Sequence, residues 1–188
     1  MVRALKYFTP NIARVKIVTR HPLRKKEVKE FEEYLSSQFP ELSAVLGKLE
    51  LGFVIELEGV GGQEANLIIL NELPALVEVE GLKIPTLILV KMSGIEGMQY
   101  AVVDEGAVKH LLNGADVMSP GITECSGFQK ESLVAVWNPT KETPLCVGKA
   151  LMSCDEVMKV RRGKAIKNLH YAGDKIWKKC LELLAKKS

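Results

Sequence analysis

The stretch VDEGAVKHLLNGADVMSPGI, residues 102–121, predicts a strand end, a short helix, a glycine break, a second short strand and a turn. Asp104 can cap the free N–H groups of the first helical turn, and Gly114 can take the left-handed conformation that ends a helix. Such a short helix is unstable alone. We therefore expect its caps and the packing of one apolar face to hold it. Pro120 and Gly121 fit the central positions of a type II turn.

The residues that follow this stretch predict a small β-barrel. Four segments have strand patterns, namely SLVAVWN (132–138), PLCVGKALMS (144–153) and a closing pair, KAIKNLHY (164–171) and KIWKK (175–179). Ser153 and Glu156 have the spacing of a capping box, which predicts a second short helix between the strands. Short strands with two small helices are typical of a compact barrel of about 80 residues. The tail KKCLELLAKKS predicts a short amphipathic helix.

The residues before this stretch predict helices packed on a strand meander. The expected elements are a basic strand in NIARVKIVTR (11–20), an amphipathic helix in 21–39 with Pro22 near its start, a short helix in 40–47, a hairpin in 53–70 and a strand pair in 75–90 with its turn at Gly81. Glycines recur near residue 95, where the strand pattern stops. We therefore predict an α+β protein of two domains, 1–95 and 96–188.

Two stretches, 102–121 and LCVGKALMSCDEVMKVRRGKAIKNLHYAGDKIW (145–177), resemble the PUA domain, a small RNA-binding β pseudobarrel with two short helices. From about residue 22 the whole chain resembles the malignant T-cell-amplified sequence family, which includes the translation machinery-associated protein of yeast. QFPEL (38–42) and PTLILV (85–90) also carry this resemblance. It implies a pre-PUA domain followed by a PUA domain. An excess of Glu and Lys over Gln and Asn, 39 against 10, is consistent with an archaeal member.

The family resemblance implies a cytoplasmic, non-catalytic translation factor. Its expected role is to bind the small ribosomal subunit in initiation, reinitiation or recycling, through rRNA or tRNA, often beside a partner with a SUI-type domain. PUA domains also accompany RNA-modifying enzymes, which makes an RNA-modification enzyme or its accessory subunit the alternative. The first 95 residues lack the clustered acids, thiol or cofactor loop that such chemistry requires. A protein-interaction module that uses the acidic middle of the chain is a third interpretation.

Charge is segregated along the chain, although the net charge is only +3. Residues 1–29 hold nine basic side chains against one acidic, and residues 157–188 hold ten against two, whereas the middle is acidic. Clustered Lys and Arg attract polyanions, so nucleic acid is the first candidate partner. Basic ends that only solubilise the surface or pair with the acidic middle are the alternative.

The resemblance and the local chemistry together select the candidate RNA contacts. In PUA domains the first helix and its glycine loop face RNA, which implicates Lys109, Asn113, Gly114 and Ala115. The group Arg161, Arg162 and Lys164 follows the second short helix and matches phosphate binding. A possible second basic surface consists of Arg24, Lys25 and Lys26. Each has a simpler explanation: Gly114 ends a helix in any case, and cations at a helix end favour its dipole.

Other chemistry-bearing residues do not form a site in the sequence. His110, Trp137 and Trp177 are typical of packed or surface positions rather than of RNA contacts. The four cysteines are separated by 21, 8 and 26 positions, so we expect no zinc site and favour buried thiols over a disulfide. No apolar run reaches the roughly 18 residues of a membrane span. We expect no metal, no cofactor, no membrane partner and no catalytic residues.

Overall fold

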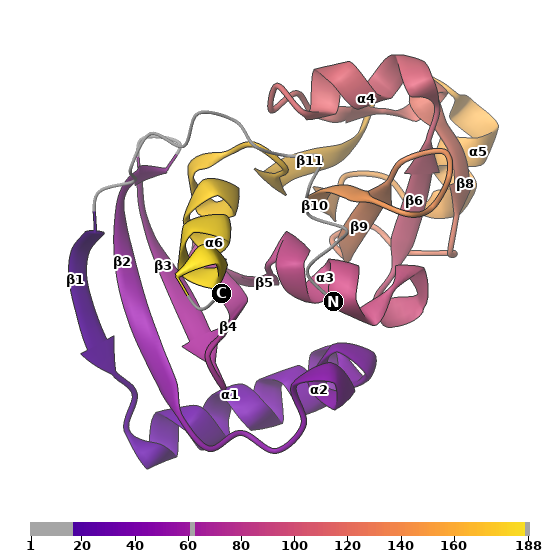
Figure 1. Cartoon of the computed structure of the whole chain (residues 1–188). Coiled ribbons are helices and arrows are strands. Elements are labelled where there is room, and N and C mark those ends of the chain that lie inside the picture. The colour runs from indigo at the N-terminus through magenta and orange to yellow at the C-terminus, as the bar shows by residue number, and fades with distance from the viewer. Residues whose placement is uncertain (1–16, 61–62, 187–188) are drawn as a thin grey trace.

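The first half of the chain forms an antiparallel sheet with helices on both faces (Figure 1). The computed structural model describes residues 17–60 and 63–186. The elements of this half are β1 (Ile17–Pro22), α1 (Lys25–Gln38), α2 (Pro40–Leu46), β2 (Gly52–Val60), β3 (Gln63–Leu70), β4 (Leu73–Val79), β5 (Leu82–Pro85), α3 (Leu87–Ser93) and η2 (Ile95–Gly97). The strands pair in chain order, β1-β2-β3-β4-β5.

Strand β3 shows why this sheet is covered twice. Successive side chains of a strand point to opposite faces. Ile68 and Leu70 belong to the hydrophobic cluster that contains residues of α1 and α2. Leu67 and Ile69 belong to the cluster that contains Ile176 of the C-terminal helix. The sheet is therefore buried on both faces.

The second half forms a curled six-stranded sheet with short helices at its rim (Figure 1). Its elements are β6 (Tyr100–Val103), α4 (Glu105–Leu111), β7 (Val117–Met118), η3 (Ser119–Gly121), β8 (Ile122–Cys125), β9 (Leu133–Trp137), β10 (Pro144–Ala150), α5 (Cys154–Val160), β11 (Lys164–Tyr171) and α6 (Lys175–Ala185). The strand order is β7-β11-β10-β9-β6-β8, and β6 lies parallel to β9. The predicted α+β class is confirmed.

The two halves share a hydrophobic core. One cluster joins Ile55 and Val77 of the first sheet to Trp137 of the second and to Ile176 and Trp177 of α6. Helix α6 comes from the second half of the chain but packs against the first sheet. The chain passes from the first sheet to the second between β5 and β6, close to the expected domain boundary near residue 95. That 1–95 and 96–188 are separate domains stays a prediction.

Two segments that the sequence pattern assigns to strands are helices. Residues 87–90 belong to α3, and the threonine before it, Thr86, accepts a hydrogen bond from the Leu89 N–H at 3.3 Å. Residues 175–179 are the start of α6, where the Asp174 carboxylate accepts from the Trp177 N–H at 2.6 Å. Both N-caps override the strand propensity of the apolar residues that follow. Trp177 is buried, as expected, but on a helix.

Three smaller expectations are also corrected. Ser119–Gly121 is a 3₁₀ turn, and Gly121 is not in the positive-φ conformation that a type II turn requires. The Ser119 N–H donates to the Gly163 carbonyl at 2.8 Å, which holds this turn against the start of β11. Pro22 ends β1 instead of opening a helix. Of the expected N-terminal strand in 11–20, residues 11–16 lie outside the described residues.

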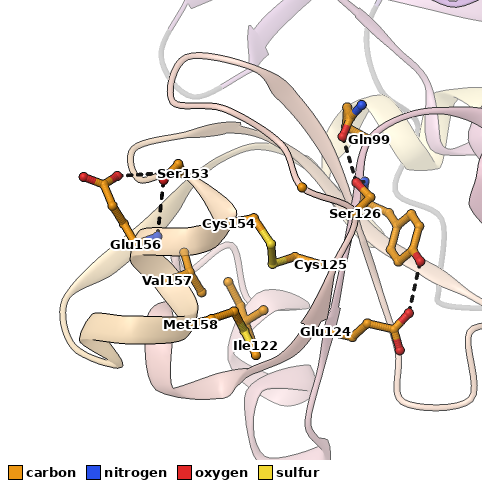
Figure 2. The surroundings of a disulfide bond; sticks show 12 residues. Gln99, Ile122, Glu124, Cys125, Ser126, Ser153, Cys154, Glu156, Val157 and Met158 are labelled. Carbon is orange, nitrogen blue, oxygen red and sulfur yellow. Dashed lines mark hydrogen bonds between the residues drawn. A yellow bond between two sulfur atoms is a disulfide. The ribbon is translucent and has the colours of Figure 1, made fainter.

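The cysteines are divided between one disulfide and two buried thiols. A disulfide joins Cys125, at the end of β8, to Cys154, the first residue of α5 (Figure 2). The expectation of four thiols is therefore wrong, because spacing in the sequence does not report which strand lies beside a helix start. Cys146 and Cys180 are free and buried, and burial raises the pKa of both thiols.

A buried polar network crosses from one half to the other. The His170 side chain is fully buried, and its Nδ1 lies 2.7 Å from the Asp174 carboxylate. Its Nε2 accepts a hydrogen bond from the Leu87 N–H of α3 at 3.3 Å. Since Nε2 accepts, Nδ1 carries the proton and donates it to Asp174. The network fixes β11, α3 and the start of α6 relative to one another.

Candidate nucleic-acid interface

An open pocket of about 810 Å³ lies between α4, the glycine loop after it and the start of β11. The residues that line it are Asp104, Gly106, Ala107, His110, Leu111, Gly114, Ala115, Asp116, Met118, Gly121 and Lys164. All of them come from the stretch 102–121 except Lys164. Most are small or apolar, so a ligand can approach the backbone here.

Helix α4 has the predicted caps. The Asp104 carboxylate accepts from the Ala107 N–H at 2.9 Å. At the other end the Asn113 side-chain amide donates to the Lys109 carbonyl, also at 2.9 Å. Leu111 is buried in the core of the second sheet, and Lys109 is exposed on the other side of the helix. Asn113 therefore has a structural role, while its carbonyl oxygen stays available.

Gly114 is required by its backbone and by a neighbour. Its φ is +83°, in the left-handed region that favours glycine. A Cβ at this position would lie 2.9 and 3.0 Å from two ring carbons of Tyr171 and 3.1 Å from its hydroxyl oxygen. The Tyr171 ring thus packs directly against the loop that borders the pocket, and its partial burial raises the pKa of the phenol. The left-handed conformation expected of Gly114 is confirmed, and Gly114 also lines the pocket. That it contacts RNA stays a prediction.

An ion pair closes one side of the pocket. The Lys164 ammonium lies 2.9 Å from the Asp116 carboxylate, which also accepts the Asn168 N–H at 3.0 Å. Partial burial raises the pKa of Asp116, but these two hydrogen bonds outweigh it and hold the pKa below its usual value. The Asn168 side chain donates to the Ala115 carbonyl at 3.1 Å. Strand β11 thereby anchors the glycine loop.

The predicted basic cluster is divided by the structure. Arg161 ends α5 with a φ of +51°, and its guanidinium donates to the carbonyls of Ile122, at 2.5 Å, and Pro120, at 3.0 Å. Arg162 is exposed and makes no hydrogen bond or ion pair with any described residue. Arg161 therefore fixes the loop between β7 and β8, whereas Arg162 is available to a ligand.

The second basic surface lies elsewhere. Arg24, Lys25 and Lys26 are exposed at the start of α1, on the side of the molecule away from α4 (Figure 1). Lys26 lies 3.8 Å from Glu30 in a surface ion pair. The structure brings Gly114, Ala115 and Lys164 together at the pocket, with Lys109 and Asn113 beside it, but not these three residues.

Sequence reasoning missed Asp116, Met118, Asn168 and Tyr171 at this site. Asp116 lies two positions after the glycine break at Gly114. An acidic side chain beside a predicted RNA-contacting loop is the sequence signal that could have identified it as a site residue. Asn168 and Tyr171 have no local signal, because only the pairing of β11 with β7 brings them beside the loop. Met118 lies on β7, and its place at the pocket likewise depends on this pairing. His110 lines the pocket as an exposed side chain, and Trp137 is buried in the core, as expected.

Within residues 17–60 and 63–186, no three His, Cys, Asp or Glu side chains gather closely enough to hold a metal ion. Among the helices formed by these residues, none is both long and apolar enough to span a bilayer.

Comparison with known proteins places the pocket inside a known domain type. The PUA domain model matches residues 99–172, which include every residue that lines the pocket. An uncharacterized protein of Methanocaldococcus jannaschii is 36% identical over 167 residues, which cover 87% of this chain and 98% of that protein. Translation machinery-associated protein 20 of Eremothecium gossypii is 30% identical over 178 residues, which cover 86% of this chain and 92% of that protein.

Solved structures support the same fold along most of the chain. A hypothetical protein from Pyrococcus horikoshii has a TM-score of 0.74 and 34% identity, with 86% of this chain and 99% of that chain covered. A PUA domain protein from Aeropyrum pernix, solved as a tartrate complex, has a TM-score of 0.77 and 25% identity, with 92% and 96% covered. The expected PUA-type pseudobarrel is thus confirmed for the second sheet and its two short helices.

Proposed function

Because the chain belongs to the family of translation machinery-associated protein 20 and the malignant T-cell-amplified sequence proteins, we propose that it is an RNA-binding accessory factor of translation that acts on the small ribosomal subunit. The observation that carries the proposal is the pocket, which lies wholly within the PUA segment and is built from the stretch that carries the resemblance. Its place of action is the cytoplasm.

The residues inside the pocket and those at its rim favour different parts of an RNA molecule. Asp104 and Asp116 would repel a phosphate inside the pocket, whereas the glycines and Ala107 accommodate uncharged groups. The exposed cations Lys109, Arg162 and Lys164 lie at or outside the rim, where phosphates can stay solvated. The site therefore suits RNA whose backbone passes over the rim.

The factor acts without catalysis in this proposal. Among the residues that the structure describes, one histidine–carboxylate pair is buried, His170 with Asp174, and its enclosure in the core leaves it no access to a substrate. The free thiols Cys146 and Cys180 are buried and have raised pKa values, so neither is a nucleophile. A partner with a SUI-type domain is part of the proposal and is expected to bind outside the pocket.

Sedimentation of cell extract through a density gradient tests the proposal. Comigration with free small subunits is the expected result. It should disappear when Arg162 and Lys164 are both changed to Ala, because phosphate contacts are lost. Presence only with free tRNA would favour an RNA-modification role instead. Recovery of a SUI-type protein in the same fractions would support the proposed partner.

A further inference from the structure

Strand β11 contains a β-bulge beside the glycine loop, residues 113–116. Cys146 of β10 pairs with Tyr171 of β11. Gly148 pairs with Asn168, so two steps along β10 correspond to three steps along β11. Cys146 and Gly148 share a face of the sheet, and cross-strand partners share a face as well. The bulge therefore turns Asn168 and Tyr171 to the same face, whereas a regular strand would point them to opposite faces.

Both of these side chains hold the glycine loop. The Asn168 amide donates to the Ala115 carbonyl at 3.1 Å. The Tyr171 ring occupies the side of Gly114 on which a Cβ would stand, and two ring carbons lie 2.9 and 3.0 Å from that position. Tyr171 lies outside the set of described residues that line the pocket. The ring thus supports the loop from behind.

The position of the Tyr171 ring is fixed through its backbone. The Tyr171 N–H donates to the Asp174 carboxylate at 3.0 Å, and the Tyr171 carbonyl accepts the Asp174 N–H at 3.1 Å. The N–H of the next residue, Ala172, donates to the Leu145 carbonyl at 2.8 Å. A ring that is held in this way limits how far the glycine loop can move toward β11.

We propose that Tyr171 is a positioning residue of the RNA site: its ring holds Gly114 and Ala115 in the shape that RNA binds, without touching the RNA. This inference rests on the proposed RNA-binding function and adds a residue that acts on the same pocket. A loop that is already ordered loses less conformational freedom when its ligand binds. The ring has this role rather than the hydroxyl, because ring carbons make the two closest approaches to Gly114.

Two substitutions at position 171 separate the ring from the hydroxyl. The probe is a set of labelled fragments that together cover the small-subunit rRNA. Tyr171→Ala removes the ring and should weaken binding by about 10-fold, because the loosened loop must be ordered when RNA binds. Tyr171→Phe keeps the ring and should bind within about twofold of wild type. Neither should change the salt slope, because Lys109, Arg162 and Lys164 remain.

Hydrogen exchange distinguishes positioning from general stability. The Gly114 N–H donates to the Leu111 carbonyl at 2.9 Å, and the Ala115 N–H donates to the His110 carbonyl at 3.1 Å. In Tyr171→Ala these two amides should exchange faster than in wild type, while the amides of β9 keep their rates. Faster exchange throughout the second half of the chain would overturn the inference.

Tyr100→Ala is the matched control. Tyr100 is also a half-buried tyrosine on a strand of the second sheet, and its hydroxyl donates to the Glu124 carboxylate at 3.0 Å. It lies outside the set of described residues that line the pocket. The substitution should lower stability but change RNA affinity by less than about twofold.

A double-mutant cycle tests the contact between the ring and the loop. Gly114→Ala places a Cβ against the ring and should weaken RNA binding by about 10-fold. In the Tyr171→Ala background the space for this Cβ is free, so Gly114→Ala should weaken binding further by less than about threefold. Losses that simply multiply would show that the two positions act independently and would overturn the inference.

The outcomes separate this inference from the function on which it rests. If wild-type protein binds no rRNA fragment, the RNA-binding proposal fails and the inference fails with it. If wild type binds and Tyr171→Ala binds equally well, only the inference is overturned. Equal losses for Tyr171→Phe and Tyr171→Ala would also overturn it, since the hydroxyl would then contact RNA. So would equal losses for Tyr100→Ala and Tyr171→Ala, since general destabilisation would then explain both.

Discussion

Strand β11 serves two regions of the molecule in opposite ways. At the junction of the two sheets His170 is fully buried, and both of its ring nitrogens are hydrogen-bonded. At the pocket the Lys164 side chain is 63% exposed and pairs with Asp116 at the surface. No water replaces a hydrogen bond lost at the junction, whereas water replaces one lost at the pocket. Substitutions at the junction should therefore lower stability, and substitutions at the pocket should lower affinity.

Removing the first half of the chain should produce the largest effect. In a fragment of residues 96–188, α6 loses the sheet against which Ile176, Trp177 and Cys180 pack. We expect β9 and β10 to keep slow amide exchange while α6 exchanges fast, measured by hydrogen exchange against the full chain. Fast exchange throughout the fragment would contradict the division into domains 1–95 and 96–188. Slow exchange in α6 would contradict its dependence on the first sheet.

Asp174→Ala should be the most destabilising single substitution at the junction. His170 Nδ1 and the N–H groups of Tyr171 and Trp177 all donate to this carboxylate. Leaving buried donors without an acceptor costs about 1–3 kcal/mol each, so we expect a loss of about 4 kcal/mol in unfolding free energy. Denaturant unfolding measures it. Asp155→Ala, at an exposed position of α5, is the control, and equal losses in both variants would refute the argument.

The disulfide should contribute slightly less. Cys125 and Cys154 are 29 positions apart, and closing a loop of this length in the unfolded chain stabilises the fold by about 3.5 kcal/mol. Cys125→Ala with Cys154→Ala should lose this amount, and a reductant should destabilise wild type but not the variant. RNA affinity should stay the same below the unfolding transition. If a reductant leaves the unfolding free energy of the wild-type protein unchanged, the disulfide contributes no stability.

The adjacent arginines sharpen the comparison within one loop. Arg161→Ala removes two hydrogen bonds to backbone carbonyls and should cost about 1–2 kcal/mol of stability. Arg162→Ala should leave stability within about 0.5 kcal/mol. It should flatten the plot of log affinity against log salt by about 0.7 for single-stranded RNA.

A variant in which Arg24, Lys25 and Lys26 are all replaced by uncharged residues is the control for the Arg161 and Arg162 variants. It should keep the wild-type salt slope, because these residues lie away from the pocket. If this variant flattens the plot of log affinity against log salt while Arg162→Ala leaves the wild-type slope unchanged, the RNA surface lies on the first half of the chain.

The smallest expected effect is the acid dependence of the pocket. The folded pKa of Asp116 lies below its unfolded value of about 3.9. Its contribution to stability is therefore complete above that unfolded value and is lost as the pH falls through the folded pKa. Asp116→Asn should flatten the decline of unfolding free energy in this acid range. A variant whose decline matches wild type would show that the Lys164 pair contributes no stability.

Local signals predicted much of the site. The caps of α4 and α5 depend on residues three positions apart, namely Asp104 with Ala107 and Ser153 with Glu156. Such short-range hydrogen bonds form wherever the helix forms, so the sequence pattern predicts them. The glycine break at Gly114 is local in the same sense.

The failures share a different cause. The strand pattern misassigned residues 87–90 and 175–179, because short apolar runs are equally compatible with a strand and with a buried helix. Packing against the first sheet decided the outcome for α6. The preference for buried thiols failed for Cys125 and Cys154, because nothing in the sequence shows that β8 and α5 lie side by side in the fold.

Residue order alone accounts for the helix caps, the glycine break, the strand-rich second half and the resemblance to a family, because each depends on neighbouring residues or on residue identity. Contacts in the folded chain establish that the Arg161 guanidinium donates to backbone carbonyls while Arg162 is available to a ligand. They also establish that Tyr171 packs against Gly114 and that Lys164 of β11 lines the same pocket as Met118. These facts depend on contacts between residues tens of positions apart, which strand pairing and burial establish and which no local pattern contains.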